Sequence, residues 1–272
     1  MMKASLTALA AAALLVATTS DAQAAGHANG LGEKGELIIS ADRLVPLFGY
    51  THSSVTIPGN NNNGQIRETS VNASGTSFLF GKDVSSYDGF GQPFNVHSIP
   101  RVAFDITIID KLTLGMGFAF AFGFGGSVKA EQVIGPNATR TTTVDAPTST
   151  MFGIAPRVGY IIPLGDVLAI WPRGGFAFYS VSFKQDVTNN NNGVVTTDKT
   201  TDTVFSIDLD PQLAIIPTEH FFFTVGPMLN IPLTGGRSHT ISQAGRSTQD
   251  DQDISILHFG IHASIGGYVG IF

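Results

Sequence analysis

The chain has 272 residues, and only 13% of them are charged, about half the usual share in a soluble globular protein. Its formal net charge of −6 offers no basic surface for nucleic acid, and the absence of cysteine excludes disulfides, thiolate nucleophiles and cysteine-ligated zinc. A content of 43% hydrophobic residues, with 31 glycines and 20 phenylalanines, excludes an intrinsically disordered chain.

The first 24 residues have the pattern of a cleaved export signal. Lys3 supplies the positive charge, residues 6–16 are apolar, and Ala22-Gln23-Ala24 matches the small-residue cleavage site. This apolar stretch is much shorter than the ~20 residues that a helix needs to span a bilayer. We therefore expect a signal peptide at residues 1–24 and one domain over residues 25–272.

Apolar and small or polar residues alternate along the rest of the chain. Between residues 112 and 124, one parity carries Leu, Met and Phe, and the other carries only Gly, Ala and Thr. A period of two residues is typical of a β-strand. The same alternation recurs and predicts eight strands, around residues 36–50, 101–108, 112–124, 151–162, 168–178, 205–215, 221–231 and 257–265.

The connections between these strands alternate in length. Short turns fall at residues 110–111, 165–166 and 218–219, and long polar links at residues 51–98, 129–149, 189–202 and 235–253. Short turns on one side and long links on the other are typical of an antiparallel up-and-down barrel in an outer membrane, with periplasmic turns. We therefore expect four long extracellular loops and periplasmic termini, with Phe78-Leu79-Phe80 extending a hairpin in the first link.

The large apolar side chains are predicted to face lipid. A surface of Gly, Ala and Thr would solvate poorly, but it suits the narrow lumen of an eight-stranded barrel, where side chains share little space. The alternative is a soluble barrel with its large side chains inside. In a bilayer the sheet must also close, because unpaired backbone groups at an edge cannot be hydrated there.

With its export signal, eight alternating strands and terminal Tyr268-Val269-Gly270-Ile271-Phe272, the chain resembles the small outer-membrane β-barrel superfamily of OmpA-type membrane domains, OmpX and the opacity proteins. The resemblance implies location in the bacterial outer membrane, contact with its lipid and lipopolysaccharide, and insertion by the outer-membrane assembly machinery. Two features depart from it. Phe272 has the opposite parity to the lipid-facing residues of the last strand, so either a bulge lies near Gly266-Gly267 or Phe272 does not point outward. The strands also contain five prolines, each of which removes a ladder hydrogen bond: Pro100, Pro156, Pro172, Pro211 and Pro227.

A Pro-Arg-x-small-aromatic motif begins at Pro100, Pro156 and Pro172. Parity places its arginines inside the barrel, on the same side of the sheet as three aspartates. The predicted lumen group is Arg101, Asp105, Arg157, Arg173, Asp208 and Asp210. We expect an ion-pair plug in which each buried charge has a partner, with Asp208 and Asp210 beside Arg173 across one ladder. The alternative is a gated or narrow path for ions.

No other group of residues has the spacing of a known site. His258 and His262 share a strand face but lie ~13 Å apart, too far to ligate one metal ion. The weakest alternative is a lipid-modifying enzyme, whose active site would include His52-Ser53 or His239. We expect a non-enzymatic structural or surface-interaction protein without a cofactor, whose extracellular ligand is unspecified; the main alternative is a narrow porin-like channel.

Overall fold

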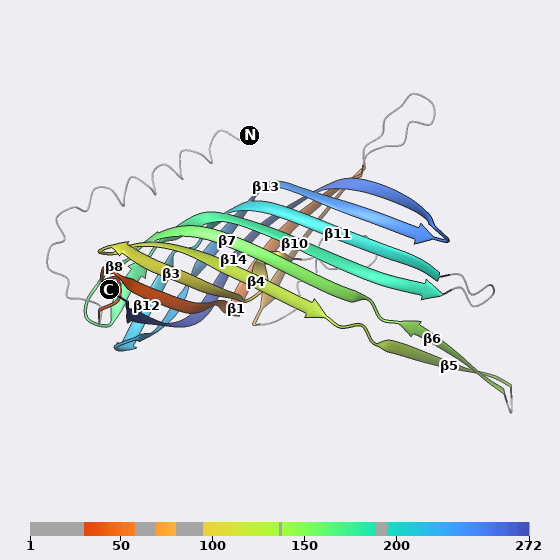
Figure 1. Ribbon diagram of the computed structural model, residues 1–272, viewed down its shortest axis with the longest axis horizontal. Helices are drawn as coiled ribbons and strands as arrows, with labels where there is room; N and C mark the ends of the chain where they lie inside the picture. The colour runs from red at the N-terminus through yellow and green to blue at the C-terminus, as the bar shows by residue number, and fades with distance from the viewer. Residues whose placement is uncertain (1–29, 58–68, 80–94, 136–137, 189–194, 272) are drawn as a thin grey trace, which may run out of the picture.

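The computed structural model describes residues 30–57, 69–79, 95–135, 138–188 and 195–271 (Figure 1). The predicted signal peptide, Phe80 and Phe272 lie outside these residues. Within them, no helix is long and apolar enough to cross a membrane.

Eight strands form a closed, hydrogen-bonded ring. In ring order they are β1 (Glu36–Ile57), β3 (Arg101–Ile109), β4 (Leu112–Gly123), β7 (Thr148–Tyr160), β10 (Arg173–Thr188), β11 (Val195–Leu209), β13 (Phe221–Gln243) and β14 (Arg246–Gly270). Every pairing is antiparallel, and the ring closes where β14 pairs with β1 and where β11 pairs with β13. The predicted fold, an eight-stranded antiparallel up-and-down barrel, is confirmed.

Two of the eight strands are split by proline. Pro172 separates β9 (Leu168–Trp171) from β10, and Pro211 separates β11 from β12 (Gln212–Thr218). Because proline has no N–H to donate, the ladder is interrupted at these points. β9 and β12 pair with each other and so continue the wall at the end of the short turns, where β8 (Ile162–Pro163) joins β9. By contrast, Pro156 and Pro227 lie within β7 and β13.

Within the described residues, the long links are largely paired strands. The β10–β11 ladder reaches Thr188 and Val195, and β13 and β14 join through the two-residue turn Ala244-Gly245. Both turn residues have positive φ, as tight hairpins require. The polar residues of these links include many β-branched threonines. Their polarity indicates a loop, but β-branched residues also suit a paired strand.

Three further strands lie in the remaining links. β2 (Thr69–Phe78) pairs with the outer part of β1, where a hairpin was expected, and β5 (Ser127–Gly135) pairs with β6 (Ala138–Asp145) in a separate two-stranded sheet. The β5–β6 hairpin and the ends of β10, β11 and β13 project at the end of the barrel opposite the C-terminus (Figure 1). This end is called the hairpin end below, and the opposite one the turn end.

The side chains alternate between the two faces as predicted. On β3 and β4, Phe104 is 42% and Phe120 54% exposed, whereas Asp105 and Ala119 are 1% exposed. On β14 the odd-numbered residues point outward, but no bulge lies at Gly266-Gly267, where both neighbouring ladders keep their register. Of the two alternatives for Phe272, the bulge at Gly266-Gly267 is therefore absent; the register shifts of these two ladders lie at Ala41–Val45 and Pro46–Phe48 in β1 and at Asn230–Gly236 in β13.

Glycines line the lumen because large side chains cross it. A Cβ atom on Gly115 would lie 2.0 Å from Oδ1 of Asp105 and 2.6 Å from the carbonyl oxygen of Phe104. A Cβ atom on Gly153 would lie 2.3 Å from the ring of Tyr179. The small face of the sequence alternation therefore makes room for side chains from neighbouring strands.

Gly153→Ala should destabilise the refolded barrel by about 1–3 kcal/mol, because the Tyr179 ring must move within a packed lumen. The measurement is denaturant unfolding of the refolded protein. Gly126→Ala is the control, since a Cβ atom there meets nothing within 4 Å. Equal stabilities of the two variants would contradict the packing described here.

Candidate functional site: the charged layer of the lumen

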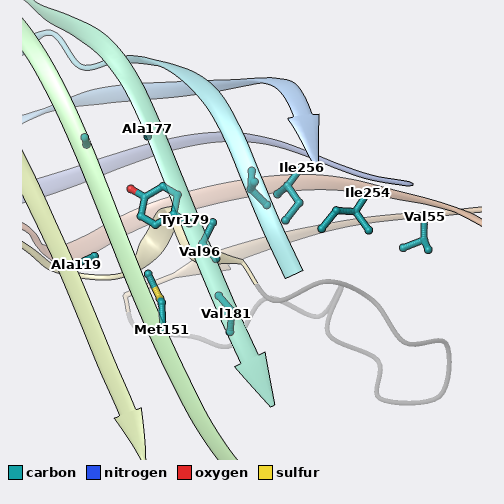
Figure 2. Packing of buried hydrophobic residues seen from close by; sticks show 11 residues of the cluster. Val55, Val96, Ala119, Met151, Ala177, Tyr179, Val181, Ile254 and Ile256 are labelled. Atoms are coloured by element: carbon teal, nitrogen blue, oxygen red, sulfur yellow. The ribbon is translucent and has the colours of Figure 1, made fainter. Parts of the chain in front are cut away.

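The lumen is filled in three layers. At the turn end lies an apolar layer around Trp171, Phe222 and Tyr268. At the hairpin end lies a second apolar layer, formed by Val55, Val96, Ala119, Met151, Ala155, Ala177, Tyr179, Val181, Val204, Ile254 and Ile256 (Figure 2). Between them lies the charged layer, which consists of Arg43, Arg101, Arg157, Arg173, Asp42, Asp105, Asp208 and Asp210.

An irregularity in β1 brings two adjacent charged residues into this layer. Between Ala41 and Val45 the β1–β14 register shifts, and Arg43 adopts a φ of 56°. The Arg43 backbone N–H donates to Oγ of Ser264 at 3.1 Å instead of continuing the ladder. As a result Asp42 and Arg43 are both buried, at 0% and 1% exposure, although strict alternation would place one of them in lipid.

Asp42 lies among three arginines. It accepts a hydrogen bond from Nη1 of Arg157, its Oδ1 lies 3.3 Å from Nη1 of Arg173, and its Oδ2 lies 3.6 Å from Nη2 of Arg101. The Ser40 hydroxyl donates to the same carboxylate at 2.8 Å. One carboxylate therefore links the arginines of three separate strands.

Asp208 is the second shared acceptor. Nη2 of Arg43 donates to both of its carboxylate oxygens at 2.8 Å, and Nη1 of Arg101 donates to Oδ2 at 2.7 Å. Nδ2 of Asn230 adds a further hydrogen bond at 3.1 Å. Charge-assisted bonds of this kind are the strong ones in a site from which water is excluded.

The other two aspartates each bind one arginine closely. Arg157 donates through Nε at 2.8 Å and Nη2 at 2.5 Å to the two oxygens of Asp105. Arg173 donates through Nη2 to Asp210 at 2.6 Å, and its guanidinium carbon lies 4.8 Å from the Trp171 ring centre. Asp210 also accepts from the Gln212 amide.

All six residues expected in the lumen lie in the charged layer. The expected pairing of Arg173 holds for Asp210, whereas Asp208 binds Arg43 and Arg101 instead. Asp42 and Arg43 were missed, because the bulge that turns both inward leaves no trace in the alternation. His262, which the sequence placed only on the same strand face as His258, has its Nε2 atom 3.3 Å from Oδ1 of Asp210.

Four arginines and four aspartates make the charged layer neutral overall. Its carboxylates are occupied by guanidinium groups, and no group of three or more His, Asp or Glu in the described part of the chain could hold a metal ion. The arrangement thus joins strands across the lumen; it does not present a nucleophile with a base.

The histidines considered for lipid chemistry do not form one site. His52 lies 2.8 Å from the Ser74 hydroxyl through Nδ1, while its neighbour Ser53 is 2% exposed on the opposite face of β1. His239 lies 2.8 Å from Asp198, on the extended β13 and β11 strands. Nearby, Arg237 binds Asp202 through two hydrogen bonds of 2.7 and 2.8 Å.

No family model matches the chain, and no curated protein sequence matches it. Among solved structures, the chain is similar to Ail, the attachment invasion locus protein of Yersinia pestis, at 10% identity over 86% of this chain and 99% of Ail, with a TM-score of 0.30. It is also similar to the outer membrane protease OmpT of Escherichia coli, at 8% identity over 86% of this chain and 96% of OmpT, with a TM-score of 0.35. The assignment of the fold rests on the hydrogen-bonded ring itself.

Arg173→Ala should destabilise the refolded barrel by about 3–5 kcal/mol, because Asp210 would remain buried without its closest cation. Adding Asp210→Asn should recover part of this loss, since it removes the unpaired charge. The measurement is a double-mutant cycle in denaturant unfolding. Lys184→Ala, which breaks the exposed pair with Asp186, is the control and should cost little. Strictly additive losses in the cycle would show that Arg173 and Asp210 do not interact.

Proposed function

We propose that the protein is a bacterial outer-membrane barrel with a closed lumen, which acts at the cell surface through the strands that extend beyond the ring. The observation that carries this proposal is the neutral charged layer, sealed by apolar layers on both sides. A lumen filled by paired charges holds the wall together and leaves the hairpin end as the part available to partners.

The outer surface of the ring supports the membrane location. Large apolar side chains are exposed around it, among them Val102, Phe104, Leu114, Met116, Phe120, Phe152, Val158, Phe176, Phe223, Phe259 and Val269. Soluble monomers rarely expose so much contiguous apolar surface. In lipid the same surface is favourable, and the closed ring leaves its backbone groups paired.

The hairpin end is the proposed extracellular side. The exposed apolar side chains around the ring are called the apolar belt below. The ladders of β10–β11 and β13–β14 continue past this belt into polar, threonine- and serine-rich segments. Such paired strands hold polar side chains in fixed positions, as a binding surface requires. With this orientation the short turns and both termini are periplasmic, the belt contacts outer-membrane lipid and lipopolysaccharide, and insertion depends on the outer-membrane assembly machinery.

Planar-bilayer recording on the refolded protein tests the closed lumen. We expect no steady conductance steps from the unmodified chain, because the charged layer fills the cross-section between two apolar layers. Steady, ion-selective steps would overturn the proposal in favour of a narrow porin-like channel. Enzymatic activity on outer-membrane lipid would overturn it in favour of the lipid-modifying alternative.

Phe104→Arg tests the membrane belt. Phe104 points outward near the middle of β3, so an arginine there should cost roughly 2–4 kcal/mol in a bilayer. Thr201→Arg, on the polar extension of β11, is the matched control and should cost little. Stability is measured by denaturant unfolding from lipid vesicles. Equal effects of the two substitutions would place the belt in water.

A further inference from the structure

A short segment of the chain enters the lumen before β3 begins. It consists of Asn95 and the single 3₁₀ turn η1 (Val96–Ser98), and the wall resumes at Arg101. Val96 packs in the hairpin-side apolar layer at 1% exposure, in the same cluster as Tyr179 and Ile256 (Figure 2). This segment, Asn95 to Ser98, is called the inner segment below.

Three polar contacts hold the inner segment against the wall. Nη1 of Arg43 donates to the carbonyl oxygen of His97 at 2.8 Å. Nδ2 of Asn95 donates to the Thr51 hydroxyl at 2.9 Å and lies 3.3 Å from Nδ1 of His258. Oδ1 of Asn95 accepts from the His97 backbone N–H at 3.1 Å and so closes the turn.

The His97 ring is buried between two other rings. It stacks on His258 with 6.0 Å between ring centres and 21° between planes, and it meets Tyr179 edge-on at 5.5 Å. Its exposure is 0%, and neither of its ring nitrogens has a hydrogen-bond partner within the described structure. A buried imidazole without an acceptor for a second proton is held in its neutral form.

The charged groups around this ring disfavour its protonation further. Arg43 faces it from β1, Arg101 from β3 and His258 from β14, and Tyr179 and Asp208 lie on β10 and β11. Asp208 is the one nearby anion among these, and its oxygens already accept from Arg43, Arg101 and Asn230. A cationic His97 would thus lie beside two arginines, with the nearest carboxylate already occupied.

We propose that the inner segment is an acid-released latch, seated in the lumen while His97 is neutral and released when His97 takes up a proton. An imidazole in water takes up its proton near pH 6.5, whereas the seated ring resists it. The released state therefore binds more protons, and acid must favour it. With one coupled proton, the ratio of released to seated chain rises about tenfold for each pH unit below that value.

The latch and the charged layer are separable. The pairs of Asp42, Asp105 and Asp210 do not involve the inner segment, so release uncovers the hairpin side of the charged layer without dismantling it. The readout is therefore the motion of the inner segment itself, not conductance. At the cell surface, exposure to acid would release the latch and so change the surface of the barrel at its hairpin end.

The test uses a spin label on Ser98→Cys, which is unique because the chain has no cysteine. Ser98 is half-buried, and its hydroxyl makes only a 3.4 Å contact within the segment. In refolded protein in vesicles, the ratio of mobile to immobile label should rise about thirtyfold between about pH 7.5 and about pH 5. The same label on Ser247→Cys, in the β13–β14 hairpin, should not respond.

The matched variant is His97→Phe, which keeps a ring for stacking but takes up no proton; His97→Gln is used if the phenylalanine variant does not refold. In either background the label should stay immobile at both pH values. The proposal is overturned if the label in the unsubstituted background does not respond to acid, or if its response survives the loss of His97. Conductance measured in parallel reports on the charged layer alone, so failure of the latch and failure of the closed lumen are distinguishable.

Discussion

Burial of charge in a narrow lumen is the constraint on which this structure depends. A guanidinium or a carboxylate without water is costly unless a partner with good geometry lies beside it. The charged layer meets this requirement by sharing: Asp42 and Asp208 each contact arginines from more than one strand. Because these shared carboxylates bind arginines of strands that are not neighbours in the ring, the charged layer links strands across the lumen.

The architecture was readable from the sequence because it follows from a single periodicity. Alternation over residues 112–124 sets both the strand and its two faces, and the glycines on the inner face leave the space that Asp105 and Tyr179 occupy. The same parity placed the three motif arginines and three aspartates in the lumen. What parity could not supply is pairing: Asp208 binds Arg43 and Arg101 because side chains reach across the lumen, beyond the adjacent strand.

The parts that sequence reasoning missed are those where alternation fails. Asp42 and Arg43 are neighbours that both point inward, which requires the register shift in β1 and the positive φ of Arg43. Positive φ is uncommon for residues other than glycine, asparagine and aspartate. An arginine at position 43 therefore gives no sequence signal for the bulge. The strand extensions were missed for a different reason: polar, threonine-rich segments satisfy both loop and strand patterns, and only the pairing partner decides between them.

Arg43 connects these observations. Its backbone is freed from the ladder by the bulge, its Nη2 atom binds Asp208 in the charged layer, and its Nη1 atom holds the His97 carbonyl of the inner segment. Wall, charged layer and inner segment therefore meet at one guanidinium. Since a planar guanidinium fixes the directions of its donors, a shift of β1 that moved Arg43 away from Asp208 would also withdraw its support from the inner segment. A lysine at this position would keep the positive charge but could not hold both hydrogen bonds in their fixed directions. The geometry of the Arg43 guanidinium, more than its charge, therefore couples the charged layer to the hairpin end.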